Sequence, residues 1–322
     1  MFWKKPQFSS DEEKVERIAS GMLAPFVLFV VFTLLGAMAG AYWLQQRGIE
    51  AHSSKLKQHV WVAYAESLKE AASLLGSLTG FVENNSLIQQ AWADKDRQAL
   101  FAAAWPVYQQ ISREGRVSHL HFFTLDRTNF LRVHSPQRYG DRIDRHTLDE
   151  AFTTQDLAWG VELGESGQFV LRVVKPWFVD GELVGYIELG ENIEHLTRRV
   201  KRTTGADLVV VIDKRYLEYK AWSEMQEQLG SRVDWNQFPD KLIIDKTFAE
   251  LPKQLLQQIG RGVEENSSVT ISDEEQIYDA SVLPAVDARK QLLGNIWILL
   301  DITTQQRDLK TLTTVFVLSS IV

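Results

Sequence analysis

The strongest feature of the hydrophobic pattern is an uncharged run of 23 residues, Met22–Leu44. An α-helix of that length rises far enough to cross a hydrocarbon core of roughly 30 Å. We expect residues 22–44 to form a transmembrane helix behind a cytoplasmic tail at 1–21. The alternative is a cleaved signal peptide, because Ala37-Met38-Ala39 has the small residues of a cleavage site. The long tail with its four acidic side chains favours the uncleaved anchor.

A second apolar run, Thr311–Val322, stops at the last residue of the sequence. Its 12 residues are too few to span a bilayer. We expect residues 309–322 to be the start of a second transmembrane helix that the sequence cuts short. The alternative is an ordinary C-terminal strand.

Between these two runs, the pattern is helical at first. Apolar residues recur at spacings of three and four from Val60 to Val82, which predicts one stripe on a long helix that continues from the first run. The polar segment Glu83–Ser86 should break this helix. A second helical run is expected over Leu87–Glu114, with Pro106 starting or kinking its last portion.

The period of the pattern then changes to two, which is typical of strands. Four strands are expected in two pairs, at 120–126 with 129–134 and at 167–179 with 182–190. The turn signal Asp180-Gly181 joins the second pair. A short helix is expected between the pairs at 144–154, and another after them at 192–204, ended by Gly205.

After Gly205 the pattern starts again, with an apolar strand inside residues 206–219. Gly185 and Gly294 each stand in a similar strand, each eight residues before an isoleucine that closes the unit. We infer an internal duplication with a period near 109 residues, the separation of these two glycines. Two unrelated hairpins are the alternative. The expected fold class is α+β, with a long helix followed by two modules built on antiparallel sheets.

Alternation along the strands of the first module separates two kinds of side chain. Leu131 and Val133 share one face of their strand, and Phe130, Arg132 and His134 are expected to share the other. The same holds for the other three strands, so one face of the sheet is aliphatic and the other is aromatic and ionisable. The aliphatic face should pack on the long helix. The other face, covered by residues 136–141 and 159–165, should form a polar cavity.

This cavity is the candidate binding site, because guanidinium forks suit carboxylates and acidic or aromatic groups suit amines. The candidate ligand-binding residues are His121, Phe123, Arg132, His134, Tyr139, Asp141, Trp159, Arg172, Trp177, Tyr186 and Glu188. The mixed charges favour a carboxylate or an amino acid as ligand. The alternative is a set of internal ion pairs, Arg132 with Glu188 and Arg172 with Glu162 or Asp141, on a solvated face.

Other kinds of site are poorly supported. His119, His121 and His134 could bring imidazoles together, but they lack the ligand spacing of a zinc site, and no metal or cofactor is expected. The segment Gly164–Gly167 lacks the spacing of a serine elbow, and no phosphate-binding loop is present, so we expect no catalysis. A net charge of −7 excludes a nucleic-acid partner. The absence of cysteine suits an extracytoplasmic compartment.

The stretches "HFFTLDRTNFLRVHSPQRYGDRID", "GVELGESGQFVLRVVKPW" and "ELVGYIELGENIEHL" resemble bacterial double-Cache sensor domains. The resemblance covers nearly all of residues 22–322. It implies two PAS-like Cache modules, a membrane-distal one at 45–200, which includes the long helix, and a membrane-proximal one at 201–308. It also implies a small-molecule pocket in the distal module.

The expected protein is therefore a homodimeric receptor of the bacterial inner membrane, with its sensory part in the periplasm. Ligand in the distal module would shift helices across the membrane toward an output domain, such as a histidine kinase or diguanylate cyclase, beyond Val322. The alternatives are a membrane-tethered adaptor that binds another periplasmic protein and an exported hydrolase.

Overall fold

The computed structural model describes residues 10–164, 166–229, 233–262, 268–273 and 275–319. The chain divides into two compact units, Leu56–Asp301 on one hand and Met1–Lys55 with Ile302–Val322 on the other. Both sheets belong to the first of these units. Residues 1–9 of the expected tail and 320–322 of the expected second membrane helix lie outside the described residues.

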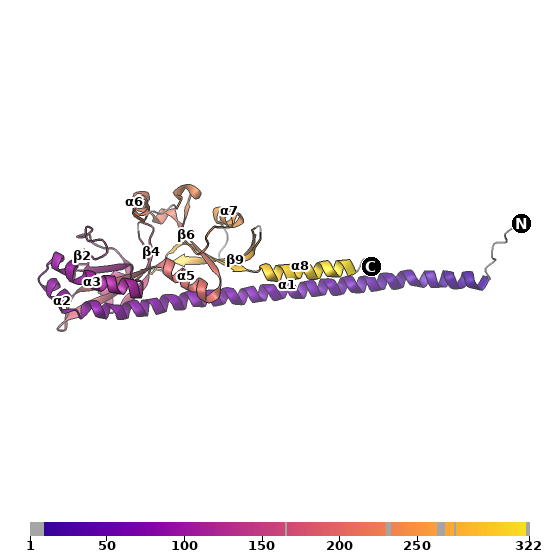
Figure 1. Cartoon of the computed structure of the whole chain (residues 1–322), viewed down its shortest axis with the longest axis horizontal. Coiled ribbons are helices and arrows are strands. Elements are labelled where there is room, and N and C mark those ends of the chain that lie inside the picture. Colours follow the sequence, from indigo (N-terminus) through magenta and orange to yellow (C-terminus); the bar gives the residue numbers. More distant parts are fainter. Residues whose placement is uncertain (1–9, 165, 230–232, 263–267, 274, 320–322) are drawn as a thin grey trace. The chain divides into compact units, whose positions relative to one another are not determined.

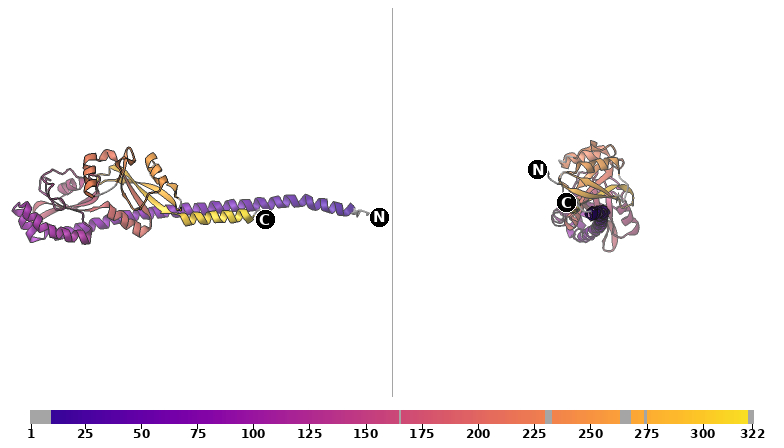
Figure 2. Two further views of the ribbon diagram at one scale, coloured as in Figure 1. Left: turned by 45° about the horizontal axis from the view of Figure 1, so that its top comes forward. Right: turned by 90° about the vertical axis from the view of Figure 1, so that its right-hand side faces the viewer.

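The unit formed by the chain ends consists of helix. Helix α1 (Ser10–Glu83) begins there, and α8 (Thr303–Ser319) lies beside its middle (Figures 1 and 2). The C-terminal strand considered as an alternative is therefore wrong, because the segment is helical. Among the described residues, one helical stretch, Pro25–Glu83, is long and apolar enough to cross a membrane.

Two helices, α2 and α3, follow α1. The N-terminus of each is capped by an asparagine or aspartate side chain. As predicted, the helix ends at Glu83, and the side chain of Asn85 accepts from the amides of Leu87 and Ile88 at the start of α2 (Ser86–Ala93). The second helical run is interrupted once more, because Asp96 caps α3 (Arg97–Gly115) in the same way. Pro106 lies inside α3 without ending it.

Each module contains a five-stranded antiparallel sheet. The first consists of β1 (His119–Phe123), β2 (Asn129–Arg132), β3 (Ala158–Leu163), β4 (Phe169–Val179) and β5 (Glu182–Asn192), in the order β2-β1-β5-β4-β3. The second consists of β6 (Asp207–Asp213), β7 (Lys241–Lys246), β8 (Ser268–Ser272), β9 (Ile277–Val286) and β10 (Leu292–Asp301), in the order β7-β6-β10-β9-β8. The two orders are the same, which confirms the duplication.

The two glycines that suggested the duplication occupy equivalent places. A Cβ on Gly185 of β5 would lie 2.6 Å from the carbonyl oxygen of Phe123 in β1. A Cβ on Gly294 of β10 would lie 2.1 Å from the carbonyl oxygen of Val211 in β6. Both positions require glycine because the neighbouring backbone leaves no room for a side chain.

The remaining helices connect or cover the sheets. They are α4 (His146–Thr154), α5 (Ile193–Thr204), α6 (Tyr219–Leu229) and α7 (Lys253–Arg261). As predicted, α4 and α5 flank the second strand pair, and α5 ends at Gly205 with a φ of +75°. One prediction is wrong: residues 159–165 do not cover the first sheet, because Ala158–Leu163 form its edge strand β3.

The aliphatic face of the first sheet packs on α1, as predicted. Leu120, Phe122 and Ile187 are fully buried in one cluster with Leu75 of α1. The opposite face is divided. Half of it is a second apolar cluster, in which Phe123 and Tyr186 pack with residues of α4. The other half carries the polar side chains of the candidate site.

Candidate functional site

A cavity of about 510 Å³ lies over the polar half of the first sheet. Its lining side chains come from β1, β2, β4, the segment after β2, the β3–β4 turn and helix α6 of the second module. They are His119, His121, Arg132, His134, Arg138, Asp141, Arg142, Ile143, Asp144, Arg145, Leu163, Gly164, Ser166, Gln168, Arg172, Ala221, Glu224 and Met225. Five of these are arginines and three are acids, so the lining carries an excess of positive charge.

Strand register brings the central polar residues together. His121 of β1 lies opposite Arg132 of β2 on one side and opposite Glu188 of β5 on the other. Gly190, two residues beyond Glu188, faces Arg172 of β4. Since residues two apart share a face, Glu188, His121, Arg132 and Arg172 all emerge on one side of the sheet.

A β-bulge changes which residue of β2 joins them. The register shifts between Phe122 and Phe123, so Phe130 is the extra residue of β2. Phe130 turns to the other face, where its ring lies 5.1 Å from that of Trp92. The prediction that Phe130 shares a face with Arg132 is therefore wrong. Asn129 takes that place, fully buried, with its amide nitrogen 3.4 Å from Nδ1 of His121.

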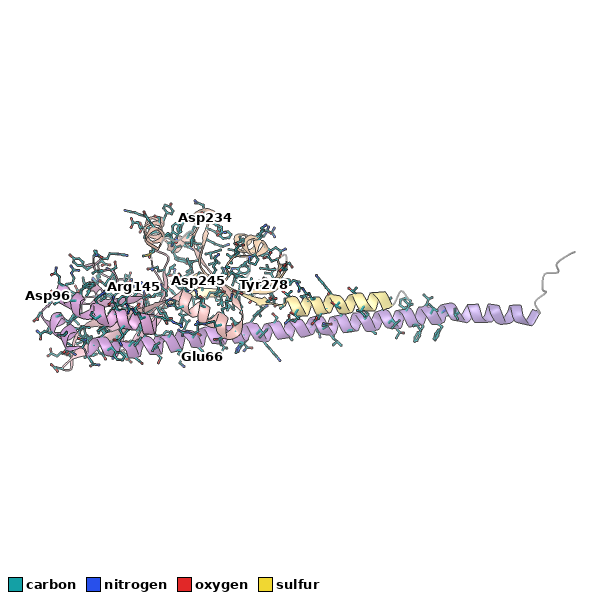
Figure 3. The ribbon with its side chains drawn as sticks, in the orientation of Figure 1. Glu66, Asp96, Arg145, Asp234, Asp245 and Tyr278 are labelled. Atoms are coloured by element: carbon teal, nitrogen blue, oxygen red, sulfur yellow. The ribbon has the colours of Figure 1, made fainter. Side chains whose placement is uncertain are left out.

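Buried ion pairs form the floor of the cavity. Nη1 of Arg172 lies 2.5 Å from Oε1 of Glu188, and Nη1 of Arg145 lies 3.1 Å from the same oxygen. Burial alone would raise the pKa of Glu188, but the charges of Arg172 and Arg145 outweigh it and hold that pKa below its usual range. Glu188 is therefore an ionised carboxylate clamped by two guanidinium groups. Arg145 is labelled in Figure 3.

A second pair closes the side of the cavity. Arg132 donates to both carboxylate oxygens of Asp141, at 2.7 and 2.6 Å, and to the carbonyl of Arg138. The hydrogen bonds from Arg132 lower the pKa of Asp141. The expected alternative therefore holds in part. Arg172 pairs with Glu162 as expected, with Nε 3.5 Å from Oε2, but Arg132 pairs with Asp141 instead of Glu188, and a cavity remains beside the pairs.

Three imidazoles line the same cavity. The ring of His134 lies 4.9 Å from that of His121 and 4.6 Å from that of His119. Burial is the main reason that the pKa values of His119 and His121 lie well below 6.5, and that of His134 is lowered to about 4. Neutral rings can each offer one donor and one acceptor. In the described part of the chain, no group of three or more His, Cys, Asp or Glu residues could hold a metal ion.

Three buried nitrogens of the lining have no hydrogen-bond partner among the described residues: Nε2 of His121, Nδ1 of His134 and Nε of Arg172. Of these, Nε of Arg172 does lie 3.5 Å from Oε2 of Glu162, within an ion pair. The cost of leaving a buried polar atom unpaired is about 1–3 kcal/mol, so each of these atoms favours a polar occupant of the cavity.

The structure brings together five of the predicted site residues in the lining: His121, Arg132, His134, Asp141 and Arg172. Glu188 lies directly beneath them, with no exposed surface.

The five remaining candidates lie elsewhere. Phe123 and Tyr186 belong to the apolar cluster under α4, beside the cavity. Tyr139 and Trp159 are exposed, and Tyr139 stacks under Arg97 instead. Trp177 is buried on the opposite face, with its ring 5.9 Å from that of Phe122. Trp177 is an odd number of residues from Arg172, so alternation already places it there.

Several residues of the site were not predicted. Asn129 contacts His121 without lining the cavity, and its place depends on a bulge. Arg145 lines the cavity and stands just before α4, outside any strand pattern. Ala221, Glu224 and Met225 come from α6 of the second module, 29 to 33 residues after Asn192, where β5 ends. No local sequence pattern predicts these three, because they reach the cavity through the packing of one module on the other.

The second sheet lacks these polar groups at the equivalent positions. The register matches three polar residues of the first sheet with three apolar ones of the second: His121 with Val209, Glu188 with Trp297, and Arg172 with Ala280. Val209, Trp297 and Ala280 belong to an apolar cluster that includes Leu255 of α7. Of the two duplicated faces, the first therefore carries the polar cavity.

A family model described as "Double sensory domain of two-component sensor kinase" matches residues 53–232, which is more than half of the chain. The chain has no significant match among curated protein sequences.

Several solved structures are similar at low identity. The sensor domain of the Vibrio cholerae histidine kinase DctB has a TM-score of 0.43 and 10% identity over 78% of this chain and 98% of its own. The periplasmic domain of Vibrio cholerae LuxQ has a TM-score of 0.45 and 12% identity over 77% and 99%. The ligand-binding domain of the Campylobacter jejuni chemoreceptor Tlp3, in complex with L-valine, has a TM-score of 0.32 and 12% identity over 80% and 97%. These similarities are too distant to indicate a ligand for this chain.

Proposed function

Because the chain belongs to the family of double sensory domains of two-component sensor kinases, which we identified above as double-Cache domains, we propose that it senses a small carboxylate-bearing molecule in the cavity over the first sheet. The site residues are His121, Arg132, His134, Asp141 and Arg172, supported from below by Glu188. The observation that carries the proposal is the pair of buried imidazole nitrogens, on His121 and His134, that have no hydrogen-bond partner among the described residues, beside the buried guanidinium of Arg172. A carboxylate accepts hydrogen bonds from such donors.

The charges that remain after internal pairing support an anionic ligand with room for one ammonium group. Arg132 is paired with Asp141, Arg172 and Arg145 with Glu188, and Asp144 with Arg289 on the second module. Three charged lining side chains form no ion pair with another described residue: Arg138, Arg142 and Glu224. Two free cations and one free carboxylate suit a small dicarboxylate or an acidic amino acid.

The apolar part of α1 supports a location of the protein in a membrane. Side chains such as Phe26, Phe29 and Phe32 are more than two-thirds exposed, which is unfavourable in water and favourable in lipid. We infer that residues 22–44 anchor the protein in the bacterial inner membrane, with the sensory modules in the periplasm. The second membrane helix at 309–322 stays a prediction from the apolar run, and the homodimer and the output domain stay predictions.

A thermal-shift screen of the full chain in detergent tests the proposal, with small mono- and dicarboxylates and amino acids as probes. A ligand present at about 100 times its Kd should raise the melting temperature by roughly 5 °C. The variant Ala221→Phe places a ring in the cavity without removing any charged group, and it should abolish the shift. The control Glu227→Phe adds the same ring at an exposed position of α6 outside the lining.

Two results would contradict the proposal. One is a screen in which no probe stabilises the protein, which would favour the protein-binding adaptor. The other is a saturable shift that Ala221→Phe and Glu227→Phe leave equally intact, because binding would then lie outside this cavity.

A further inference from the structure

The turn between β9 and β10 of the second module reaches the edge strand of the first. The amide of Ala288 donates a 2.8 Å hydrogen bond to the carbonyl of Val161 in β3. Beside it, a Cβ on Gly160 would lie 2.6 Å from the Cβ of Ala288. The Cβ of Ala288 leaves no room for a side chain at position 160, which makes this a specific contact.

The next residue of the turn touches the cavity segment. Nη2 of Arg289 lies 2.9 Å from Oδ1 of Asp144, which lines the cavity. Both side chains are well exposed, so the ion pair alone contributes little. The ion pair holds Asp144 in place, and Asp144 directly precedes Arg145, whose guanidinium pairs with Glu188.

Gly160 also lies against the start of α4. A Cβ there would meet Cγ2 of Thr147 at 3.7 Å. The amide of Thr147 donates to Oε1 of Glu162 at 2.9 Å, and Oε2 of Glu162 lies 3.5 Å from Nε of Arg172. The turn, the edge strand and the helix start therefore meet at one point, close to both arginines that hold Glu188.

We propose that Ala288 and Arg289 are positioning residues, which fix the segment 141–145 and thereby the clamp of Arg145 on Glu188. The same turn leads into β10, which ends at Asp301, two residues before α8 begins. Movement of the segment 141–145 would therefore be passed through the turn to β10, the strand that precedes α8. This role in signalling rests on the proposed function, whereas the positioning role does not.

Amide hydrogen exchange of the ligand-free full chain tests the proposal. Gly160→Ala should displace the turn and raise exchange about tenfold at the Ala288 amide and at the Ile143 amide, which donates to the carbonyl of Arg127. Ala288→Gly removes the opposing methyl group and should change neither rate. The double variant Gly160→Ala/Ala288→Gly should recover the exchange rates of the natural protein, because the closest remaining contact is to the Cα of residue 288 at 3.3 Å.

The reverse direction completes the test, because coupling between two sites is reciprocal. Asp141→Asn, which weakens the Arg132 pair inside the cavity, should raise exchange at Ala288, and this effect should disappear in Gly160→Ala and return in the double variant. The proposal is overturned if Gly160→Ala leaves the exchange of the Ile143 amide unchanged, or if adding Ala288→Gly fails to restore the rates of the natural protein. It is also overturned if Asp141→Asn leaves Ala288 unchanged. Since no ligand is present, such a failure is distinct from a failure of ligand binding.

Discussion

Nη1 of Arg172 and Oε1 of Glu188 lie 2.5 Å apart, and the two side chains are 3% and 0% exposed. Buried charges of this kind need counter-charges beside them. Each has a second one, because Nη1 of Arg145 lies 3.1 Å from Oε1 of Glu188 and Oε2 of Glu162 lies 3.5 Å from Nε of Arg172. A buried pair of this kind stabilises little by itself, but removal of one partner leaves the other charge only partly compensated.

We therefore predict that Glu188→Gln lowers the free energy of unfolding by about 3–5 kcal/mol. Chemical denaturation at neutral pH measures this loss. The control is Glu83→Gln, which removes the partner of Lys175 in a pair of similar length, 2.6 Å, but with 34% and 19% side-chain exposure. Its loss should be less than about 1 kcal/mol. Equal losses in the two variants would contradict the prediction and show that Glu162, 3.5 Å from Nε of Arg172, is a sufficient counter-charge.

The stability of the protein should fall in mildly acidic solution because of the buried imidazoles. The pKa of His134 is about 4 in the folded protein, against 6.5 for an ordinary histidine. Between these values the unfolded chain binds the proton and the folded chain does not, so the contribution of His134 is full at neutral pH and is lost as pH falls. The loss is on the order of 3 kcal/mol by about pH 4.

Denaturation of the natural protein and of His134→Gln across this pH range measures that contribution. The difference in unfolding free energy between the two should shrink as the pH falls from 7, because glutamine does not titrate. A difference that stays constant with pH would contradict a buried neutral imidazole at position 134.

Glu224 should set the preference between two ligands of the same size. Succinate and L-aspartate both carry two carboxylates, and only L-aspartate carries an ammonium group. Because Glu224 forms no ion pair with another described residue, it is available for that ammonium. We predict that Glu224→Gln weakens L-aspartate binding relative to succinate by about tenfold, a charge-assisted contact worth about 1.4 kcal/mol. Calorimetric titration of the natural protein and of Glu224→Gln with each ligand measures the ratio of the two dissociation constants. A ratio that is the same in both proteins would contradict the assignment of Glu224 to the ammonium group.

Much of the architecture could be predicted from the sequence because it depends on local periodicity. Alternation placed Leu131 and Val133 toward α1 and Arg132 toward the cavity, and the polar stretch before Asn85 marked the end of the helix. The duplicated glycines could be recognised because a close backbone approach tolerates no other residue.

The errors arose where structure departs from local periodicity. The bulge at Phe130 interrupts the alternation of β2, so that Asn129 instead of Phe130 shares a face with Arg132. No residue type in that stretch predicts a bulge. Trp177 was assigned to the cavity for its chemistry, although its odd separation from Arg172 places it on the opposite face. Glu224 and Arg289 approach the cavity from the second module, through packing that depends on the whole fold.

The most direct test of the cavity is the nuclear magnetic resonance of its histidine rings. The chain has seven histidines, so selective ¹⁵N labelling gives few ring signals to assign. In a titration with succinate or L-aspartate, we predict saturable ring shifts for His121 and His134, which line the cavity, and none for His59 or His146. Saturable binding that leaves the rings of His121 and His134 unchanged would show that the first sheet carries no carboxylate site.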